Sequence, residues 1–153
     1  MGIGEVSEMK IDPAKYKELT YKIIGAAMEV HNHLGPDHNE EVYQKALENE
    51  FNTQGLAFEP QKSVSIEYKG SQVGLRFLDF VVDDRVIVEI KATSELTSLH
   101  QWQVLYYFAA TEYPIALLIN FGSDKLEYKR LLPNEKILTY REKKEKKERI
   151  PSR

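Results

Sequence analysis

Residues 85–120 constrain the fold more than any other part of the chain. Residues 85–91 are rich in Val and Ile and predict a central strand, whereas apolar residues recur at helical steps between 97 and 111. Residues 114–120 are then almost wholly apolar, as expected of a second buried strand. A strand, a helix and a strand in succession are typical of a right-handed βαβ unit, in which the two strands are parallel. We therefore predict at least one parallel strand pair.

The chain before this unit is expected to open with two helices. Asp12 followed by Pro13 is a favourable helix start, and apolar residues then recur every three or four positions until Gly35 and Pro36. Asn39 can cap a second amphipathic helix that follows directly. The first third of the chain therefore predicts a helical pair.

A β-hairpin is expected next. Apolar and polar residues alternate at 64–68 and again at 73–77, and Lys69 and Gly70 between them are suited to a tight turn. Residues 78–82 extend the β pattern.

Together with a last strand at 125–132, these elements give the order ααββββαββ. The sequence therefore predicts an α/β fold with a mixed four- to five-stranded sheet flanked by helices.

The length and composition predict a single folded domain. At 153 residues and 42% hydrophobic content, the chain can bury one substantial core but not two ordinary domains. We expect an N-terminal extension at 1–11, the domain at 12–133, and a charged, basic tail at 134–153. No run of eighteen apolar residues and no leader-like segment is present, which predicts a soluble, cytoplasmic protein without a membrane partner.

The charge is divided unevenly along the chain. The net charge is −3, but residues 141–153 contain seven Lys or Arg and three Glu, so they carry +4 and residues 1–140 carry −7. An acidic body disfavours tight non-specific binding to a polyanion, because that affinity comes largely from neutralised phosphates. The basic tail is open to two interpretations, a nucleic-acid arm or a solvated helix end, and its mixture of Lys and Glu favours the second.

Three charged residues lie in or beside the predicted central strands. Glu89 and Lys91 are two positions apart, so their side chains emerge from the same face, and the hairpin can place Asp79 beside them. Burying such groups is costly unless they pair or bind a cation. The chain has no cysteine, so a metal would need oxygen or imidazole ligands. Asp79 and Glu89 with the backbone carbonyl of Ile90 would form an open site suited to Mg²⁺ or Mn²⁺.

The same residues permit a structural interpretation. Asp79 would then cap a strand end, and Glu89 and Lys91 would form a salt bridge on a solvent-facing sheet edge. Spacing alone favours neither interpretation, because an Asp followed ten residues later by Glu-x-Lys is a moderately common coincidence.

The histidines do not indicate a metal site of their own. His31-Asn32-His33 has the same letters as the motif of the HNH nucleases. The residues of that motif are dispersed over a ββα finger, whereas these three are adjacent at a helix end. None of the four histidines has ligand spacing on one helix face. For His100, helix capping or proximity to substrate is favoured over metal ligation.

Further segments carry a resemblance to a known family. In order over residues 20 to 132 they read EVHNHLGP (29–36), EEVY (40–43), YKG (68–70), RFLD (76–79), VIVEIKA (86–92), HQWQVLYY (100–107) and LLINF (117–121). This series resembles the GxxExxY family, a branch of the PD-(D/E)xK nuclease superfamily. One position departs from the family pattern, because Asp37 stands where the motif has its glycine.

The resemblance implies a restriction-endonuclease-like core in which Asp79, Glu89 and Lys91 form the site. Glu40 would be the acid of the N-terminal helix, reaching the metal region directly or through water. Gln103 would orient Lys91 or the scissile phosphate.

The tyrosines in the matching segments include Tyr43 and Tyr107. Both lie on apolar helix faces, so core packing is favoured over catalysis for them.

The implied activity is Mg²⁺- or Mn²⁺-dependent hydrolysis of nucleic-acid phosphodiester bonds, with DNA favoured as substrate. A homodimer would allow both strands of a duplex to be cut. The alternative is a degenerate module that keeps the nuclease fold and binds nucleic acid or a protein partner without cleavage. The acidic body and the lack of a separate DNA-reading domain favour that alternative, whereas the full set of acids with the lysine favours an active nuclease.

Overall fold

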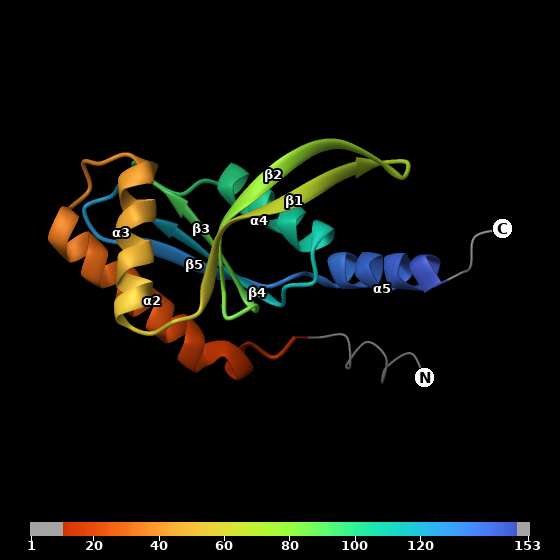
Figure 1. Ribbon diagram of the computed structural model, residues 1–153, viewed down its shortest axis with the longest axis horizontal. Coiled ribbons are helices and arrows are strands. Elements are labelled where there is room, and N and C mark those ends of the chain that lie inside the picture. Colours follow the sequence, from red (N-terminus) through yellow and green to blue (C-terminus); the bar gives the residue numbers. More distant parts are fainter. Residues whose placement is uncertain (1–10, 150–153) are drawn as a thin grey trace.

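One mixed sheet of five strands forms the centre of the fold, in the order β1-β2-β3-β4-β5. The computed structural model describes residues 11–149 (Figure 1). The elements along the chain are η1 (Pro13–Tyr16), α2 (Lys17–Leu34), α3 (Glu40–Thr53), β1 (Phe58–Tyr68), β2 (Ser71–Val82), β3 (Val86–Lys91), α4 (Ser98–Ala110), β4 (Ile115–Asn120), β5 (Glu127–Leu131) and α5 (Glu135–Arg149).

Strands β3 and β4 are parallel and are connected through α4, whereas every other neighbouring pair is antiparallel. The predicted parallel pair and the α/β fold class with a mixed sheet between helices are confirmed. The predicted element order differs in two places, since helix α5 follows β5 and residues 73–77 and 78–82 belong to one strand, β2, which pairs with β1 along its length. Three strands rather than four therefore precede α4.

The predicted helix starts are confirmed by their capping bonds. Asp12 accepts a hydrogen bond from the Ala14 N–H at 3.0 Å, at the start of the short helix η1 that leads into α2. Asn39 accepts one from the Val42 N–H at 3.2 Å at the start of α3. Gly35, with a φ of 70°, ends α2. Within residues 11–149, no helix is both long enough and apolar enough to span a membrane.

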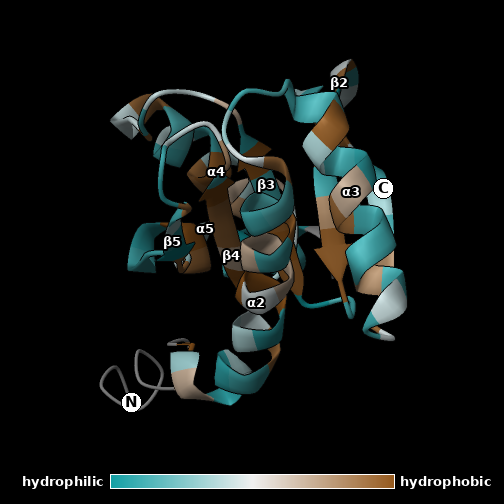
Figure 2. Ribbon diagram, turned by 90° about the vertical axis from the view of Figure 1, so that its left-hand side faces the viewer, coloured by the Kyte–Doolittle hydropathy of each residue, from teal (hydrophilic) through white to brown (hydrophobic). Residues whose placement is uncertain are grey.

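Helices cover both faces of the sheet and bury two hydrophobic cores. The core under α2 and α3 includes Val88, and the core under α4 and α5 includes its neighbour Ile87, because consecutive strand residues point to opposite faces. Strands β3 and β4 are apolar nearly throughout because both of their faces are covered. Figure 2 shows these hydrophobic strands in brown beside α2 and α3, which are mostly hydrophilic with interspersed hydrophobic residues.

The β1–β2 hairpin changes face at Asp79. Leu78 packs in the core under α4, whereas Phe80, two positions later, packs in the core under α2 and α3. In a regular strand these two side chains would share a face. Gln61, opposite Asp79 in the register of the two strands, has a positive φ of 51°. Both strands therefore twist at this point. Asp79 lies at the twist, between a residue that faces one core and a residue that faces the other.

Residues 135–149, within the segment predicted as a charged tail, form helix α5, which agrees with the helical interpretation of that segment. The helix is attached to the domain through Arg141, which is 8% exposed. Its Nε donates to the Phe108 carbonyl and its Nη2 to the Tyr113 carbonyl, both at 2.8 Å. Of the predicted N-terminal extension, residues 1–10 lie outside the described part of the chain, as do residues 150–153 of the tail.

Candidate active site

The ladder between β2 and β3 ends where the two predicted acids face each other. The paired residues of the two strands run from Val82 opposite Val86 to Phe80 opposite Val88. Continuing this register by one residue puts Asp79 opposite Glu89.

Side-chain bonds replace the ladder at this point. The Asp79 N–H donates to Glu89 Oε1 at 3.0 Å, and the Ile90 N–H donates to Asp79 Oδ2 at 2.8 Å. The two carboxylates thus satisfy the backbone donors that separated strands would otherwise leave unpaired. The split in the sheet and the pair of acids are one structural feature.

Glu89 and Lys91 lie on the α4 side of β3, because they alternate with residues of the opposite core. Glu89 is 3% exposed. Lys91 Nζ donates to Gln103 Oε1 of α4 at 2.8 Å, and Gln103 Nε2 in turn donates to the Tyr107 hydroxyl at 3.4 Å. The structure therefore brings four of the predicted residues, Asp79 included, to one place, and α4 fixes the position of the lysine.

The electrostatics of the two acids are those of a crowded, buried pair. Burial raises the pKa of Glu89 well above its usual range, and the negative charge of Asp79 raises it further. Burial also raises the pKa of Asp79, while the hydrogen bond from the Ile90 N–H opposes that rise. Both carboxylates cannot ionise cheaply at this separation without a nearby cation. Lys91 lowers the pKa of each acid but does not cancel the effect of burial.

Glu40 lies at the edge of this pair rather than in it. It is exposed in the first turn of α3, and its charge raises the pKa of Asp79. Gln44, one turn later, donates from Nε2 to the Asp79 carbonyl at 3.1 Å, which holds the start of α3 against β2. Within the described residues, no group of three or more His, Asp or Glu is arranged to hold a metal ion. The buried part of the site consists of two acids.

A family model for the PD-(D/E)XK nuclease superfamily matches residues 17–131, which span the split strands and α4. The chain belongs to the PD-(D/E)xK nuclease superfamily. The matched region contains all five predicted site residues.

Other comparisons give only distant likenesses. No curated protein matches the chain. The crystal structure of SSO0001 is similar at 15% sequence identity over 72% of this chain and 59% of that one, with a TM-score of 0.48. An alkaline exonuclease (LHK-Exo) from Laribacter hongkongensis is similar at 13% identity over 71% of this chain and 68% of that one, with a TM-score of 0.38. The chain thus spans 59% of the length of the first of these proteins.

Besides Tyr107, three residues that contact these side chains were not predicted from the sequence to lie there. Gln44 and Gln61 touch Asp79, and the hydrogen bond from Gln61 lowers the pKa of that acid. Arg76 hydrogen-bonds the hydroxyl of Tyr107, whose pKa burial raises. The sequence could have suggested Arg76, because it stands three residues before Asp79 in the RFLD segment. The contacts of Gln44 and Gln61 with Asp79 depend instead on the packing of α3 and on the twist of the hairpin.

The loop after Lys91 is held by a buried amide. Asn120, which is fully buried, accepts from the Thr93 N–H at 3.0 Å and donates to the Thr93 carbonyl at 2.9 Å. Gly122 passes so close that a Cβ there would lie 2.4 Å from the Thr93 nitrogen and oxygen. This close packing fixes the chain two residues beyond the lysine.

His100, Tyr43 and Tyr107 each have a structural role that can be compared with the prediction. His100 forms a capping box with Thr97 at the start of α4, which confirms the capping interpretation. Tyr43 is fully buried, stacks on Phe121 and donates to the Gly35 carbonyl, as expected of a packing residue. Tyr107 is also buried, but its hydroxyl faces the Lys91–Gln103 pair rather than the core alone.

Proposed function

We propose that this chain is a nuclease that hydrolyses phosphodiester bonds of nucleic acid, DNA in preference to RNA, with Mg²⁺ or Mn²⁺ held by Asp79 and Glu89. The observation that carries the proposal is the pair of carboxylates in the split between β2 and β3, next to a lysine positioned by a second side chain. A structural salt bridge at an exposed sheet edge does not account for it, because Glu89 is buried and none of the ion pairs within residues 11–149 includes it.

The donor atoms fit a hard divalent cation. Asp79 and Glu89 supply carboxylate oxygens, and a bound cation would relieve the repulsion that raises both pKa values. The Ile90 N–H points to Asp79, and because the N–H and C=O of a strand residue point the same way, its carbonyl faces the same gap. Water would complete the coordination, and Glu40 would act through such a water, since it is exposed at the rim. When bound, the ion would polarise the phosphoryl oxygen and lower the pKa of a bound water.

The chain's own residues would orient the reactants. Lys91 would place its ammonium beside the attacking water and the phosphoryl oxygens, where it stabilises the negative charge that develops in the transition state. Gln103 is a positioning residue, because its Oε1 accepts from Lys91 Nζ and limits where the ammonium can go. Tyr107 orients Gln103 in turn.

We also propose that the chain is a member of the GxxExxY branch of the superfamily. Asp37 replaces the motif glycine, yet α3 begins normally at Glu40 with Asn39 as its cap. The substitution therefore leaves the position of Glu40 intact, and the loss of the glycine does not argue against activity.

The second candidate function is a degenerate module that binds nucleic acid or a protein partner without cutting. The net charge of −7 over residues 1–140 favours it, because an acidic body gains little affinity from phosphate contacts. The two candidates differ in turnover and not in fold.

The test is cleavage of end-labelled single-stranded DNA, duplex DNA and RNA in Mg²⁺ or Mn²⁺, by the wild type, Lys91→Ala and Lys45→Ala. Lys45 is the matched control because its side chain is exposed on α3, where it pairs with Glu41. We expect metal-dependent cutting, with DNA cut faster than RNA, by the wild type and by Lys45→Ala but not by Lys91→Ala. Binding without cutting would favour the degenerate module, and equal cutting by Lys91→Ala would overturn the mechanism. Sedimentation of the same samples with duplex DNA tests whether the protein acts as a homodimer.

A further inference from the structure

Large apolar side chains are exposed along α4 beside the site. Trp102, the single tryptophan of the chain, is 65% exposed, Tyr106 is 40% exposed and Leu99 is 76% exposed. The three residues lie three and four positions apart, so they form one stripe on the helix. An exposed, contiguous apolar stripe of this kind more often belongs to a binding surface than to a surface that contacts only solvent.

This stripe is one wall of a pocket of about 440 Å³, which we call the α4 pocket. The β1–β2 hairpin supplies the opposite wall through Ile66 and Arg76. Gln103, which accepts the hydrogen bond from Lys91, lines the same pocket. A ligand in the α4 pocket would therefore adjoin the proposed reaction centre.

The charge of the pocket differs from that of the protein body. No carboxylate among the described residues lines it, and its basic side chains are Arg76 and His100. The Arg76 guanidinium lies 5.9 Å from the centroid of the Tyr106 ring, and it also bonds the Tyr107 hydroxyl near Glu89. A cation thus stands between the aromatic stripe and the two acids, an arrangement that suits a ligand carrying both flat rings and phosphates.

We infer that the α4 pocket binds an unpaired base of single-stranded DNA, which stacks on Trp102 and Tyr106 while Arg76 contacts a neighbouring phosphate. This inference rests on the proposed nuclease function and adds the strand form of its substrate. In a duplex the faces of each base are covered by its neighbours, so exposed aromatic side chains stack only on bases that are unstacked.

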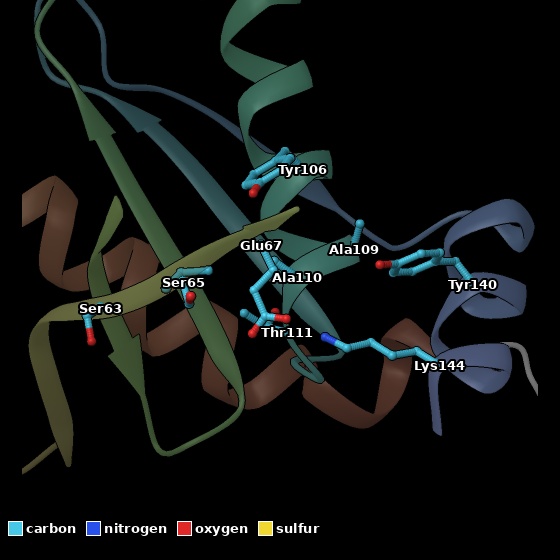
Figure 3. A pocket seen from close by; sticks show the side chains of 10 residues that line it. Ser63, Ser65, Glu67, Tyr106, Ala109, Ala110, Thr111, Tyr140 and Lys144 are labelled. Atoms are coloured by element: carbon cyan, nitrogen blue, oxygen red, sulfur yellow. The ribbon is translucent and has the colours of Figure 1, made fainter. Parts of the chain in front are cut away.

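A second pocket is lined by Ala109 and Ala110, further along the same helix (Figure 3). Tyr106 lines both pockets, and Tyr140 and Lys144 of α5 lie at the far end of the second. Figure 3 shows these two side chains directed from α5 toward α4 and β1. Glu67 also lines this second pocket, which makes it less favourable to phosphate than the first. A strand held in the α4 pocket would leave it over Tyr106 toward Tyr140 and Lys144.

Trp102 reports on this binding directly because it is the only tryptophan. Metal-free protein in EDTA is titrated with a short oligothymidine strand, with a duplex of the same length, with an abasic DNA strand of that length and with oligouridine. We expect the DNA strand to quench the tryptophan emission at saturation, and the duplex and the abasic strand to leave it unchanged. Equal quenching by the duplex or by the abasic strand, quenching by RNA alone, or no quenching by any strand would overturn the inference.

Variants separate stacking from charge. Tyr106→Ala should weaken the quenching constant by about tenfold, the scale of one lost stacking contact. Arg76→Ala should weaken it through a lost phosphate contact, so its effect should shrink as the salt concentration rises. Tyr21→Ala should leave it unchanged, since Tyr21 is 74% exposed on α2, outside the α4 pocket. Because all of these side chains are at least partly exposed, circular dichroism should show wild-type folding for each, and unchanged binding by folded Tyr106→Ala and Arg76→Ala would overturn the inference.

The quenching test and the cleavage test can succeed or fail independently of each other. Quenching without cleavage in Mg²⁺ would leave the α4 pocket in place and remove the nuclease proposal. Cleavage of single-stranded DNA with an unchanged KM in Trp102→Ala and Tyr106→Ala would do the reverse, keeping the nuclease and removing the stacking site.

Discussion

Replacing Glu89 with Gln is expected to stabilise the metal-free protein at pH 8. Glu89 is 3% exposed beside Asp79, and burial raises the pKa of both acids. Gln keeps the size of the side chain and an oxygen that accepts from the Asp79 N–H, but it removes the charge. Relief of a poorly compensated buried charge is worth about 1–3 kcal/mol. At about 2–4 °C per kcal/mol for a chain of this length, Tm should rise by about 2–12 °C.

A divalent ion should offset most or all of this advantage. Mn²⁺ at 100 times its Kd stabilises the folded state by about 2.7 kcal/mol, or about 5–11 °C in Tm, and the gain requires both carboxylates. The wild type should therefore gain stability in Mn²⁺ while Glu89→Gln gains little. The assay is thermal unfolding followed by circular dichroism, in EDTA and in Mn²⁺, with Glu18→Gln on the surface of α2 as control.

One result would refute the reasoning directly. If Glu89→Gln were less stable than the wild type in EDTA, and if Mn²⁺ shifted both proteins equally, Glu89 would be a structural acid that stabilises the strands and does not bind metal.

Three further predictions follow from the buried acids, from the anchor of α5 and from the loop behind the lysine. Because the folded pKa of Glu89 is raised, its contribution to stability is present below the unfolded pKa and is lost as pH rises through the folded pKa, at about 1.4 kcal/mol per unit of pKa difference. Urea unfolding in EDTA should show Glu89→Gln gaining on the wild type from pH 5 to pH 8, and a constant difference would contradict this. Arg141→Ala should cost about 1.5–3 kcal/mol in the same assay, because two carbonyls lose a charged donor, whereas the exposed Lys146→Ala should change little. Gly122→Ala should cost about 1–3 kcal/mol and slow cleavage, because its Cβ would collide with the Thr93 backbone, and a stable, fully active variant would show that this loop does not position the site.

The parts of the fold that follow from local periodicity could be predicted from the sequence. The apolar strands β3 and β4 and the helix between them imply the parallel pair that is observed. The same rule of alternation places Glu89 and Lys91 on one face, and the helical step of α4 places Gln103 within reach of the lysine. The predicted association of these residues with Asp79 agrees with their observed geometry.

What the sequence could not predict depends on departures from regular geometry. Alternation in β2 breaks between Leu78 and Phe80 because the strand twists at Asp79, and a broken alternation resembles the end of one strand and the start of another. The twist is shared with Gln61 on β1, a partner that only the pairing of the strands identifies. The split of β2 from β3 is likewise a property of two strands together.

The C-terminal helix shows a different limit. Its Lys and Glu residues predict a solvated segment, and most of them are exposed. Arg141 has the same charge as its neighbours, but it is buried against the end of α4 and bonded to two carbonyls. Composition does not distinguish one anchoring cation from several solvated ones.

The most direct test of the proposed metal site is a titration of Mn²⁺ followed by electron paramagnetic resonance, with the wild type, Asp79→Ala and the exposed-loop control Asp124→Ala. We predict one bound Mn²⁺ per chain for the wild type and for Asp124→Ala, and none for Asp79→Ala at the same concentrations. Equal binding by Asp79→Ala, or no binding by the wild type, would contradict the assignment of the split between β2 and β3 as a metal centre.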